Sequence, residues 1–212
     1  MLIQDIYTQY KIPPHLQLHM LRVAWVCKMI CENWTGEKLH TDAVVQAALL
    51  HDLGNRVKMW ILPGIHEPTG KELDEFLATR DEMREKYGRN DHLANVMICK
   101  ELDVQQRVIN LVDGIWFEKF TSYTLHDAED LIINYSDLRV GPKGVLTTYE
   151  RLREAAMRYD NQKRLIALES TIQATDAQEA NIFQHCSITP DDMTDESIDP
   201  LLDELRWYEI QT

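Results

Sequence analysis

The sequence contains little of what a turn-rich or membrane-spanning protein needs. Only eight glycines and seven prolines occur among its 212 residues, so a β-sandwich or barrel with many tight turns is not expected. No stretch approaches the roughly 20 apolar residues that span a bilayer. The first residues hold an early acid, Asp5, and no long apolar run, unlike a secretory signal. These absences predict a helical protein of the cytoplasm.

Positive charge is also scarce. The chain has 22 lysines and arginines against 35 aspartates and glutamates, a formal net charge of −13. A nucleic-acid polymer is therefore not expected as a partner, because binding its backbone relies on clustered Lys and Arg. The same charge would repel a small anionic substrate at long range. A phosphate site in this chain needs a strong local positive charge, and a metal ion would supply one.

Cysteine is limited to four residues, and none of them forms a CxxC pair. Cys27 and Cys31 are four apart on a predicted helix, so they are one candidate pair of metal ligands. Buried free thiols are the favoured interpretation, which suits a reducing cytoplasm.

Apolar periodicity predicts helices through most of the first half. From His15 to about Trp34, after the Pro13–Pro14 break, apolar residues recur with a period of 3.6 residues. Thr41 is predicted as the N-cap of a second helix that Gly54 closes. Further helices are predicted over 71–88, 91–102 and 104–116, and a short helix with an irregular loop is expected over 57–69.

The second half is less regular. Segment 125–140 starts like a helix, although LIINY within it could equally be a buried strand, since periodicity cannot decide so short a run. GPKG at 141–144 breaks the chain. Residues 148–183 predict one long helix or two, and a terminal helix is expected after Pro190 or Pro200. With no strong hairpin signal anywhere, the predicted fold class is all-α.

His19 lies on the apolar stripe of the first long helix. The stripe is made by Leu16, Met20, Val23, Cys27 and Ile30. An unpaired polar group inside a protein costs about 1–3 kcal/mol, so a buried imidazole must find a partner. Taken alone, a core histidine bonded to a carbonyl is the simpler interpretation.

The His51–Asp52 pair changes that balance. His51 shares a face with Val44, Ala47 and Ala48, so a second imidazole points inward from a second helix. Asp52 projects about 100° further around the axis. The two can bind one ion only near the end of a helix, and Gly54 permits such an end.

Asp137 is the third candidate, in an apolar segment of its own. Its alternative interpretation is an ion pair with Arg139. Two histidines and two aspartates together offer two nitrogen and two oxygen ligands, a set that suits Mn²⁺, Fe²⁺, Ni²⁺, Co²⁺, Zn²⁺ or Mg²⁺.

These residues stand in a pattern that resembles the HD-domain phosphohydrolase superfamily. The matching stretches are PPHLQLHMLRVAWV, AALLHDLGN and NYSDLRV, which lie within about residues 13 to 142. The resemblance implies that His19, His51, Asp52 and Asp137 bind one divalent metal ion per chain. It also implies an all-α HD-domain bundle over residues 1–160, with a C-terminal helical extension, residues 161–212, packed on it as part of one structural domain.

The resemblance further implies metal-dependent hydrolysis of a small phosphate ester, with a nucleotide monophosphate as the favoured substrate. Asp52 is the expected residue to orient or deprotonate a water, and His92 a substrate or proton-transfer residue. A second metal is not expected, because the helix that would supply another histidine pair reads INLVDGIWF. Expected substrate contacts are Asn55, Lys58 and Arg139.

Two alternatives remain open at this point. Related monophosphatases carry a glutamate shortly after the His-Asp doublet, which is His51–Asp52 in this chain. At the corresponding positions this chain has Gly54, Asn55 and Arg56. The substrate could therefore be a cyclic phosphodiester, or the protein could be a low-turnover sensory module that binds metal and nucleotide.

The remaining expectations concern the other histidines and the partners. His66 and Glu67 are expected to line the pocket. His15, His40, His126 and His185 are expected to be structural or on the surface. A small phosphorylated substrate is the expected partner, without membrane or nucleic acid, in a monomer or homodimer.

Overall fold

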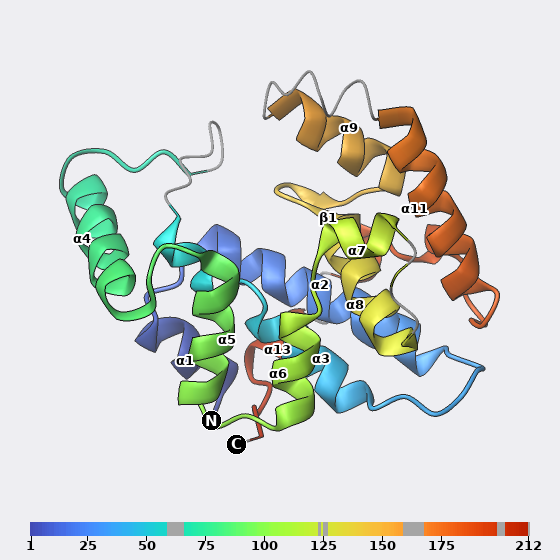
Figure 1. Cartoon of the computed structure of the whole chain (residues 1–212), viewed down its shortest axis with the longest axis horizontal. Helices are drawn as coiled ribbons and strands as arrows, with labels where there is room; N and C mark the ends of the chain where they lie inside the picture. The colour runs from blue at the N-terminus through green and yellow to red at the C-terminus, as the bar shows by residue number, and fades with distance from the viewer. Residues whose placement is uncertain (59–65, 123, 125–126, 159–167, 199–201, 212) are drawn as a thin grey trace.

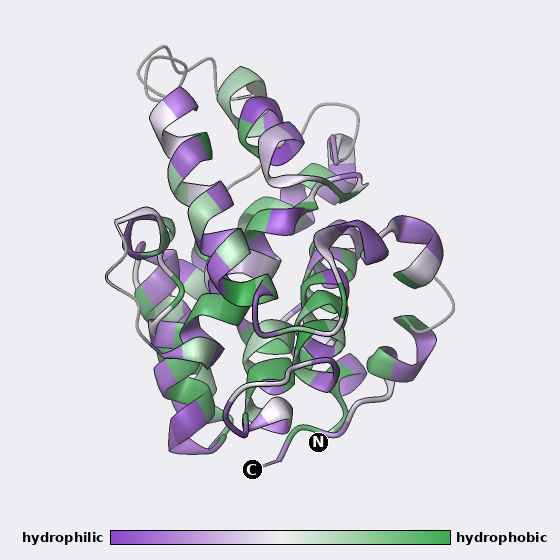
Figure 2. Ribbon diagram, turned by 90° about the vertical axis from the view of Figure 1, so that its right-hand side faces the viewer, coloured by the Kyte–Doolittle hydropathy of each residue, from purple (hydrophilic) through white to green (hydrophobic). Residues whose placement is uncertain are grey.

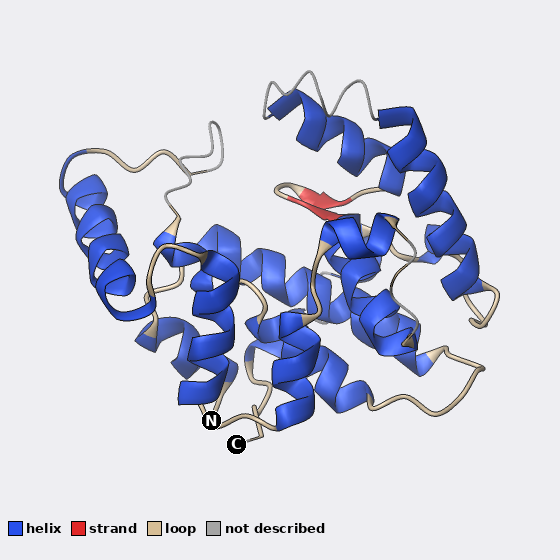
Figure 3. Cartoon of the chain, viewed as in Figure 1, coloured by secondary structure: helices blue, strands red, loops and turns tan. Residues whose placement is uncertain are grey.

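In the computed structural model the chain is almost entirely helical (Figure 3). The described residues are 1–58, 66–122, 124, 127–158, 168–198 and 202–211. The helices of the first half are α1 (Ile3–Gln9), α2 (Pro14–Glu32), α3 (Thr41–Leu50), the 3-10 helix η1 (Leu53–Val57), α4 (Gly70–Tyr87), α5 (Asp91–Glu101) and α6 (Gln106–Asp113). Then follow α7 (Phe117–Thr121), α8 (Ala128–Arg139), the strands β1 (Val140–Gly141) and β2 (Gly144–Val145), α9 (Thr148–Arg158), α11 (Leu168–Phe183), η2 (Pro190–Asp192), α12 (Asp195–Ile198) and α13 (Leu202–Arg206).

The central element is α2, which begins with a proline in its first turn, where a missing N–H costs nothing. It packs against α3, α8 and α13, so it is buried on more than the single predicted stripe. Trp25 and Leu21, outside that stripe, are both almost fully buried. Burying each such side chain contributes about 1.5–3 kcal/mol, and this fixes the position of α2 within the bundle.

The other helices around the core are α3, α5, α6 and α8. The short α3 packs on α6 and α8, while α5 packs on η1 and α6 (Figure 1). In Figure 2 most helices carry hydrophobic residues on one side and hydrophilic residues on the other. The highly charged α4 lies at one side of the molecule and contacts η1 and α5.

The C-terminal helices pack back onto this bundle. α9 and α11 pack against each other, and α11 also contacts α7 and α8. The described parts of 148–183 are therefore two helices and not one continuous helix. The two termini lie together (Figure 1), where Leu2 pairs with Glu209 and the Met1 amino group donates to the Ile210 carbonyl at 3.0 Å. The predicted domain boundary at residue 160 lies outside the described residues and stays a prediction.

The structure decides one open alternative and corrects two local predictions. LIINY belongs to α8 and is helical throughout. A two-stranded hairpin pairs Val140 with Val145, and the GPKG segment supplies its turn. Thr41 is the first residue of α3 and does not cap it through its side chain, and α3 already ends at Leu50.

Two expectations fall on parts of the chain that are not described, namely His126 and the segment 59–65 of the expected loop. Within the described part, no helix is both long enough and apolar enough to cross a membrane.

Candidate metal centre

Three helices bring the predicted ligands together. His19 lies on α2, His51 and Asp52 follow directly after α3, and Asp137 lies in the last turn of α8. Because α2 packs against both α3 and α8, residues more than a hundred positions apart in the sequence meet at one point.

The ligand atoms are spaced as a single ion requires. The Asp137 Oδ1 atom lies 3.1 Å from His19 Nε2 and 3.4 Å from His51 Nε2. The Asp52 Oδ2 atom lies 3.7 Å from both of these nitrogens. Ligand atoms that share an ion at about 2.1 Å stand roughly 3.0–3.4 Å apart. The ligand atoms of His19, His51 and Asp137 form a compact group within 4.8 Å, and Asp52 borders it.

The hydrogen bonding of His51 prepares its ring for a cation. Its Nδ1 atom lies 2.7 Å from the Ala48 carbonyl oxygen, which can only accept, so Nδ1 carries the proton. In the neutral ring Nε2 then holds the free lone pair. That atom is buried and has no hydrogen-bond partner among the described residues. A buried acceptor without a partner is costly, and a metal ion would satisfy it. The residues present therefore fit a divalent ion.

The charges of the site also favour a cation. Burial lowers the pKa of His51, but the nearby carboxylates of Asp52 and Asp137 outweigh it and raise this pKa to about 9. Burial would raise the pKa of Asp137, but His19 and His51 hold it well below its ordinary value. The two carboxylates therefore stabilise a positive charge at this point, and either a proton or a divalent ion can supply that charge.

The site is buried on its imidazole side and open on its carboxylate side. The His51 side chain is 2% exposed, whereas that of Asp137 is 36% exposed and that of Asp52 is 22% exposed. A substrate can therefore approach across the two carboxylates.

Asn95 on α5 fixes the doublet in place, and sequence reasoning missed it. Its side-chain amide donates to the His51 carbonyl, and its Oδ1 accepts from the Gly54 N–H. Gly54 itself has no space for a side chain, since a Cβ would lie 2.3 Å from the Asp91 carbonyl oxygen. The only sequence signal was an amide on the apolar face of the predicted helix 91–102.

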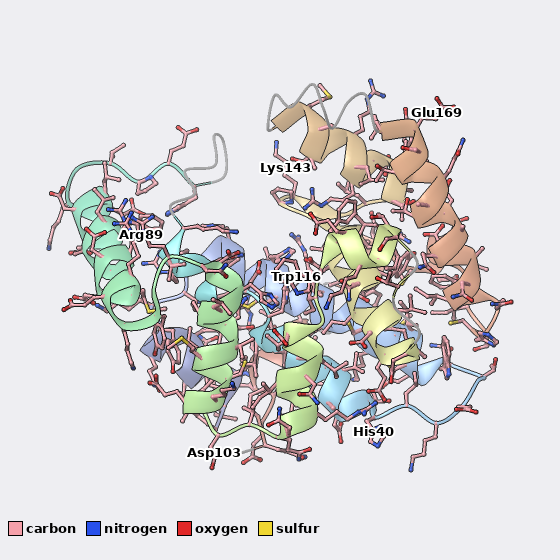
Figure 4. All side chains as sticks on the ribbon, in the orientation of Figure 1. His40, Arg89, Asp103, Trp116, Lys143 and Glu169 are labelled. Carbon is pink, nitrogen blue, oxygen red and sulfur yellow. The ribbon has the colours of Figure 1, made fainter. Side chains whose placement is uncertain are left out.

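His92 lies beside an exposed tryptophan. Its Nε2 is 2.8 Å from Asp113 Oδ1, and its ring centroid is 4.3 Å from that of Trp116. The Trp116 N–H donates to the side chain of Asn134 at 2.8 Å. Asn134 lies one helical turn before Asp137 on α8, so both project from the same side of the helix. His92 and Trp116 therefore lie on the side of α8 that also carries Asp137, and Figure 4 shows Trp116 in the middle of the molecule. Sequence reasoning had singled out His92 but not Trp116.

The three expected substrate contacts differ in outcome. Asn55 is half-buried in η1, and its N–H donates to the Asp52 carbonyl at 3.1 Å. Lys58 forms an ion pair with Asp91 close by. The prediction for Arg139 was wrong, because its guanidinium is buried and bonded to Tyr135, Glu179 and the carbonyls of Leu146 and Pro190. Arg139 is also not the partner of Asp137.

The remaining histidines divide into two groups. His185 is exposed, and the His40 side chain is 67% exposed and pairs with Glu129, as expected for surface residues. His15 and His66 are half-buried, with ring centroids 4.6 Å apart. His66 thus lies near the start of α2, and His15 is not an isolated surface residue.

The comparisons with known proteins agree with this geometry. Residues 17–113 match the family model of the HD domain. The chain carries an HD domain. Members of this superfamily are in general metal-dependent phosphohydrolases. No curated protein and no solved structure matches the chain. The matched segment contains His19, the His51–Asp52 doublet and His92 but ends before Asp137, so the placement of Asp137 beside the two histidines rests on the structure and not on the family match.

The surroundings of His15 predict how stability depends on pH. Burial and the charges of His66, Arg56 and His19 lower the pKa of His15 to about 4, from an ordinary 6.5. Between these values the unfolded chain binds more protons than the folded one, so His15 makes the fold less stable as pH falls from about 6.5 to 4. Urea unfolding at pH 7 and pH 5 should show a smaller loss of stability in His15→Gln than in the wild type. A His185→Gln control should lose as much as the wild type, and an equal loss in His15→Gln would contradict the prediction.

Proposed function

We propose that this protein hydrolyses small phosphate esters with one bound divalent metal ion, and that its substrates are nucleotides. The observation that supports this most strongly is the convergence of two imidazole nitrogens and two carboxylate oxygens, in which His51 Nε2 makes no hydrogen bond to any described residue. A purely structural cluster would pair its own donors and acceptors.

His19, His51, Asp52 and Asp137 would hold the ion. When bound, such an ion polarises a phosphoryl oxygen and lowers the pKa of a water molecule. Asp52 lies at the edge of the cluster, 3.7 Å from both imidazoles, and is partly exposed. It is therefore the carboxylate best placed to orient the attacking water and accept its proton.

His92 is the candidate general acid. Its Nε2 is bonded to Asp113, so Nδ1 is the nitrogen left to face a substrate. The carboxylate of Asp113 orients the ring, as an aspartate beside a catalytic histidine does. Nδ1 could then protonate the leaving oxygen of the ester.

The exposed indole of Trp116 supports a nucleotide as substrate. Trp116 is 40% exposed and its ring lies against His92, while its indole N–H donates to the Asp113 carbonyl and its backbone N–H to Asn134 on α8. Stacking of a base on an aromatic side chain contributes about 1–3 kcal/mol and tolerates any base. The net charge of −13 favours a small nucleotide over a polymer. A nucleoside monophosphate is our first choice, with a cyclic phosphodiester as the next.

The direct test is turnover after the metal has been defined. We expect chelated and dialysed protein to hydrolyse nucleotides only after Mn²⁺, Co²⁺ or Ni²⁺ is added. Because general acid–base catalysis contributes about 10²–10⁴-fold, Asp52→Asn should reduce kcat at least about 100-fold. The matched control is Asp103→Asn, because Asp103 is exposed and far from Asp52 in the sequence (Figure 4). Equal trace activity in the wild type and in Asp52→Asn would contradict the proposal.

One observation favours a sensory module as the second candidate. Where two-metal relatives carry further histidines, α6 contributes Asp113 and no histidine. Binding of metal and nucleotide to the wild type without any turnover would support that alternative and overturn the proposed hydrolase.

A further inference from the structure

Arg56 is a buried arginine with no ion-pair partner among the described residues. It is 4% exposed, and its Nε and Nη1 atoms are buried and make no hydrogen bond to any described residue. Burial lowers its pKa to about 10, so the guanidinium is charged at neutral pH. A buried charge with no counter-charge is costly, so an anion from outside the chain is the obvious candidate to neutralise it.

Arg139 shows what a structural arginine looks like in this same protein. It is 3% exposed, close to the value for Arg56. Each of its three nitrogens donates to an acceptor, among them Tyr135 Oη at 2.5 Å and the Pro190 carbonyl at 3.2 Å. The two side chains are equally buried, so burial alone does not explain the free donors of Arg56.

The ring contacts around Arg56 bring together one phenyl ring and two imidazoles. Its guanidinium lies over the ring of Phe76, 4.5 Å from the centroid. The ring of His66 is 5.3 Å from Phe76 and 4.6 Å from His15. His66 Nε2 is also buried without a partner among the described residues. We call these four residues, Arg56, His66, His15 and Phe76, the Arg56 cluster. His15, His66 and Phe76 are half-buried, so the cluster lies near the surface.

The Arg56 cluster borders the metal centre. His15 lies four residues before His19 on α2, so the two project from the same side, about 6 Å apart along the axis. Arg56 lies in η1, which begins directly after Asp52. One ligand of moderate size could therefore reach both places.

We propose that the Arg56 cluster is a second phosphate-binding subsite beside the metal centre. The planar guanidinium would donate two parallel hydrogen bonds to phosphate oxygens, and His66 Nε2 would donate a third. Resting on the proposed function, this refines the substrate from a nucleoside monophosphate to a nucleotide with two separate phosphate groups. One phosphate reacts at the metal centre, and the other is held about one helical turn away.

The first experiment measures binding of inorganic phosphate to chelated, metal-free protein by calorimetry at low ionic strength. We expect the wild type to bind phosphate and Arg56→Met to bind it at least tenfold more weakly, because charge-assisted hydrogen bonds are the strong ones. Arg89→Met, which removes an exposed charge (Figure 4), should bind like the wild type. In phosphate-free buffer Arg56→Met should be no less stable than the wild type, because it removes an uncompensated charge.

Several results would overturn the proposed phosphate-binding subsite. Absence of phosphate binding by the wild type would overturn it, and so would equal affinity in the wild type and Arg56→Met. If Arg56→Met does not fold, Arg56→Lys replaces it. Lysine keeps the charge but lacks the planar fork, so affinity should fall severalfold. Unchanged affinity in that variant would also overturn the subsite.

A second readout separates this proposal from the proposed function. With metal present, the wild type should show a lower KM for a nucleoside 3′,5′-bisphosphate than for the 5′-monophosphate, and Arg56→Met should remove the difference while kcat stays similar. If both nucleotides are hydrolysed and Arg56→Met changes neither KM, the subsite is overturned and the proposed hydrolase stands. Arg56-dependent phosphate binding without turnover of any ester overturns the hydrolase and leaves the phosphate site intact.

Discussion

An Asp137→Asn variant is expected to lose its metal and with it all turnover. Asp137 Oδ1 is the atom that approaches both imidazoles, at 3.1 Å and 3.4 Å. Asparagine keeps the shape but removes the charge that balances a divalent ion. Loss of a residue that only supports a ligand reduces metal affinity about 10–100-fold. Loss of a ligand itself should therefore cost at least about 100-fold, measurable by titration with Mn²⁺ and by metal analysis.

Thermal unfolding provides a second readout that does not depend on any substrate. A ligand at 100 times its Kd stabilises the folded state by about 2.7 kcal/mol, so Mn²⁺ should raise the Tm of the wild type and not that of Asp137→Asn. Asp103→Asn is the control, because Asp103 is exposed and its left-handed backbone (φ 55°) is one that asparagine adopts readily. If Asp137→Asn retained stoichiometric metal with unchanged affinity, this aspartate would not be a ligand.

The metal-free form of Asp137→Asn should also be less stable than the metal-free wild type. His19 and His51 hold the pKa of Asp137 well below its ordinary value in the folded state. A depressed carboxyl pKa contributes stability above the ordinary value and loses it as pH falls. At pH 7 the contribution is therefore present in the wild type and absent in the variant.

The residues of the candidate metal centre could be picked out from the sequence because each departs from an expected pattern. His19 and His51 are imidazoles on apolar helix faces, where leucine or valine would be ordinary. Asp137 is a carboxylate in an otherwise apolar segment. Such departures mark positions where a buried polar group needs a partner, and one ion can serve several of them at once.

Arg139 shows where proximity in sequence misleads. The interval from Asp137 to Arg139 is two residues, and on a helix this turns the side chain by about 200°. The two side chains therefore point to opposite sides of α8. Asp137 faces α2 and the end of α3, whereas Arg139 reaches Glu179 on α11.

The segment LIINY was ambiguous because α8 is buried on nearly all sides. α8 contacts α2, α3, α6, α7, α9 and α11, and a helix in such surroundings shows no amphipathic period.

Asn95, Trp116 and the free donors of Arg56 could not be predicted from the sequence. Asn95 acts through the backbone of η1, which α5 meets only once the bundle has folded. The environment of Trp116 depends on the hydrogen bond that its backbone N–H donates to the Asn134 side chain, eighteen positions away. The lack of hydrogen-bond partners for Arg56 Nε and Nη1 among the described residues becomes apparent only when the neighbouring side chains have been placed in space.

A Gly54→Ala variant is expected to lose both stability and metal affinity. A Cβ at this position would lie 2.3 Å from the Asp91 carbonyl oxygen and 2.6 Å from the Asn95 backbone nitrogen. Both are main-chain atoms of α5 and cannot rotate away, so α5 and η1 must separate. Overpacking of this kind costs about 3 kcal/mol, at the upper end of its usual range. The separation would also disrupt the hydrogen bonds that join Asn95 to His51 and to Gly54, which should weaken Mn²⁺ binding.

Gly114→Ala is the matched control for this test. There the added Cβ would meet Asp130 Oδ1 at 2.7 Å, the end of a side chain that can turn aside, so the cost should be about 1 kcal/mol or less. Urea unfolding of the metal-free variants compares the stabilities, and Mn²⁺ titration compares the sites. If Gly54→Ala lost stability but bound Mn²⁺ like Gly114→Ala, the contact between α5 and η1 would support the fold alone. If it lost affinity as well, as we expect, the backbone packing at Gly54 positions His51 and Asp52, because neither ligand itself has been changed.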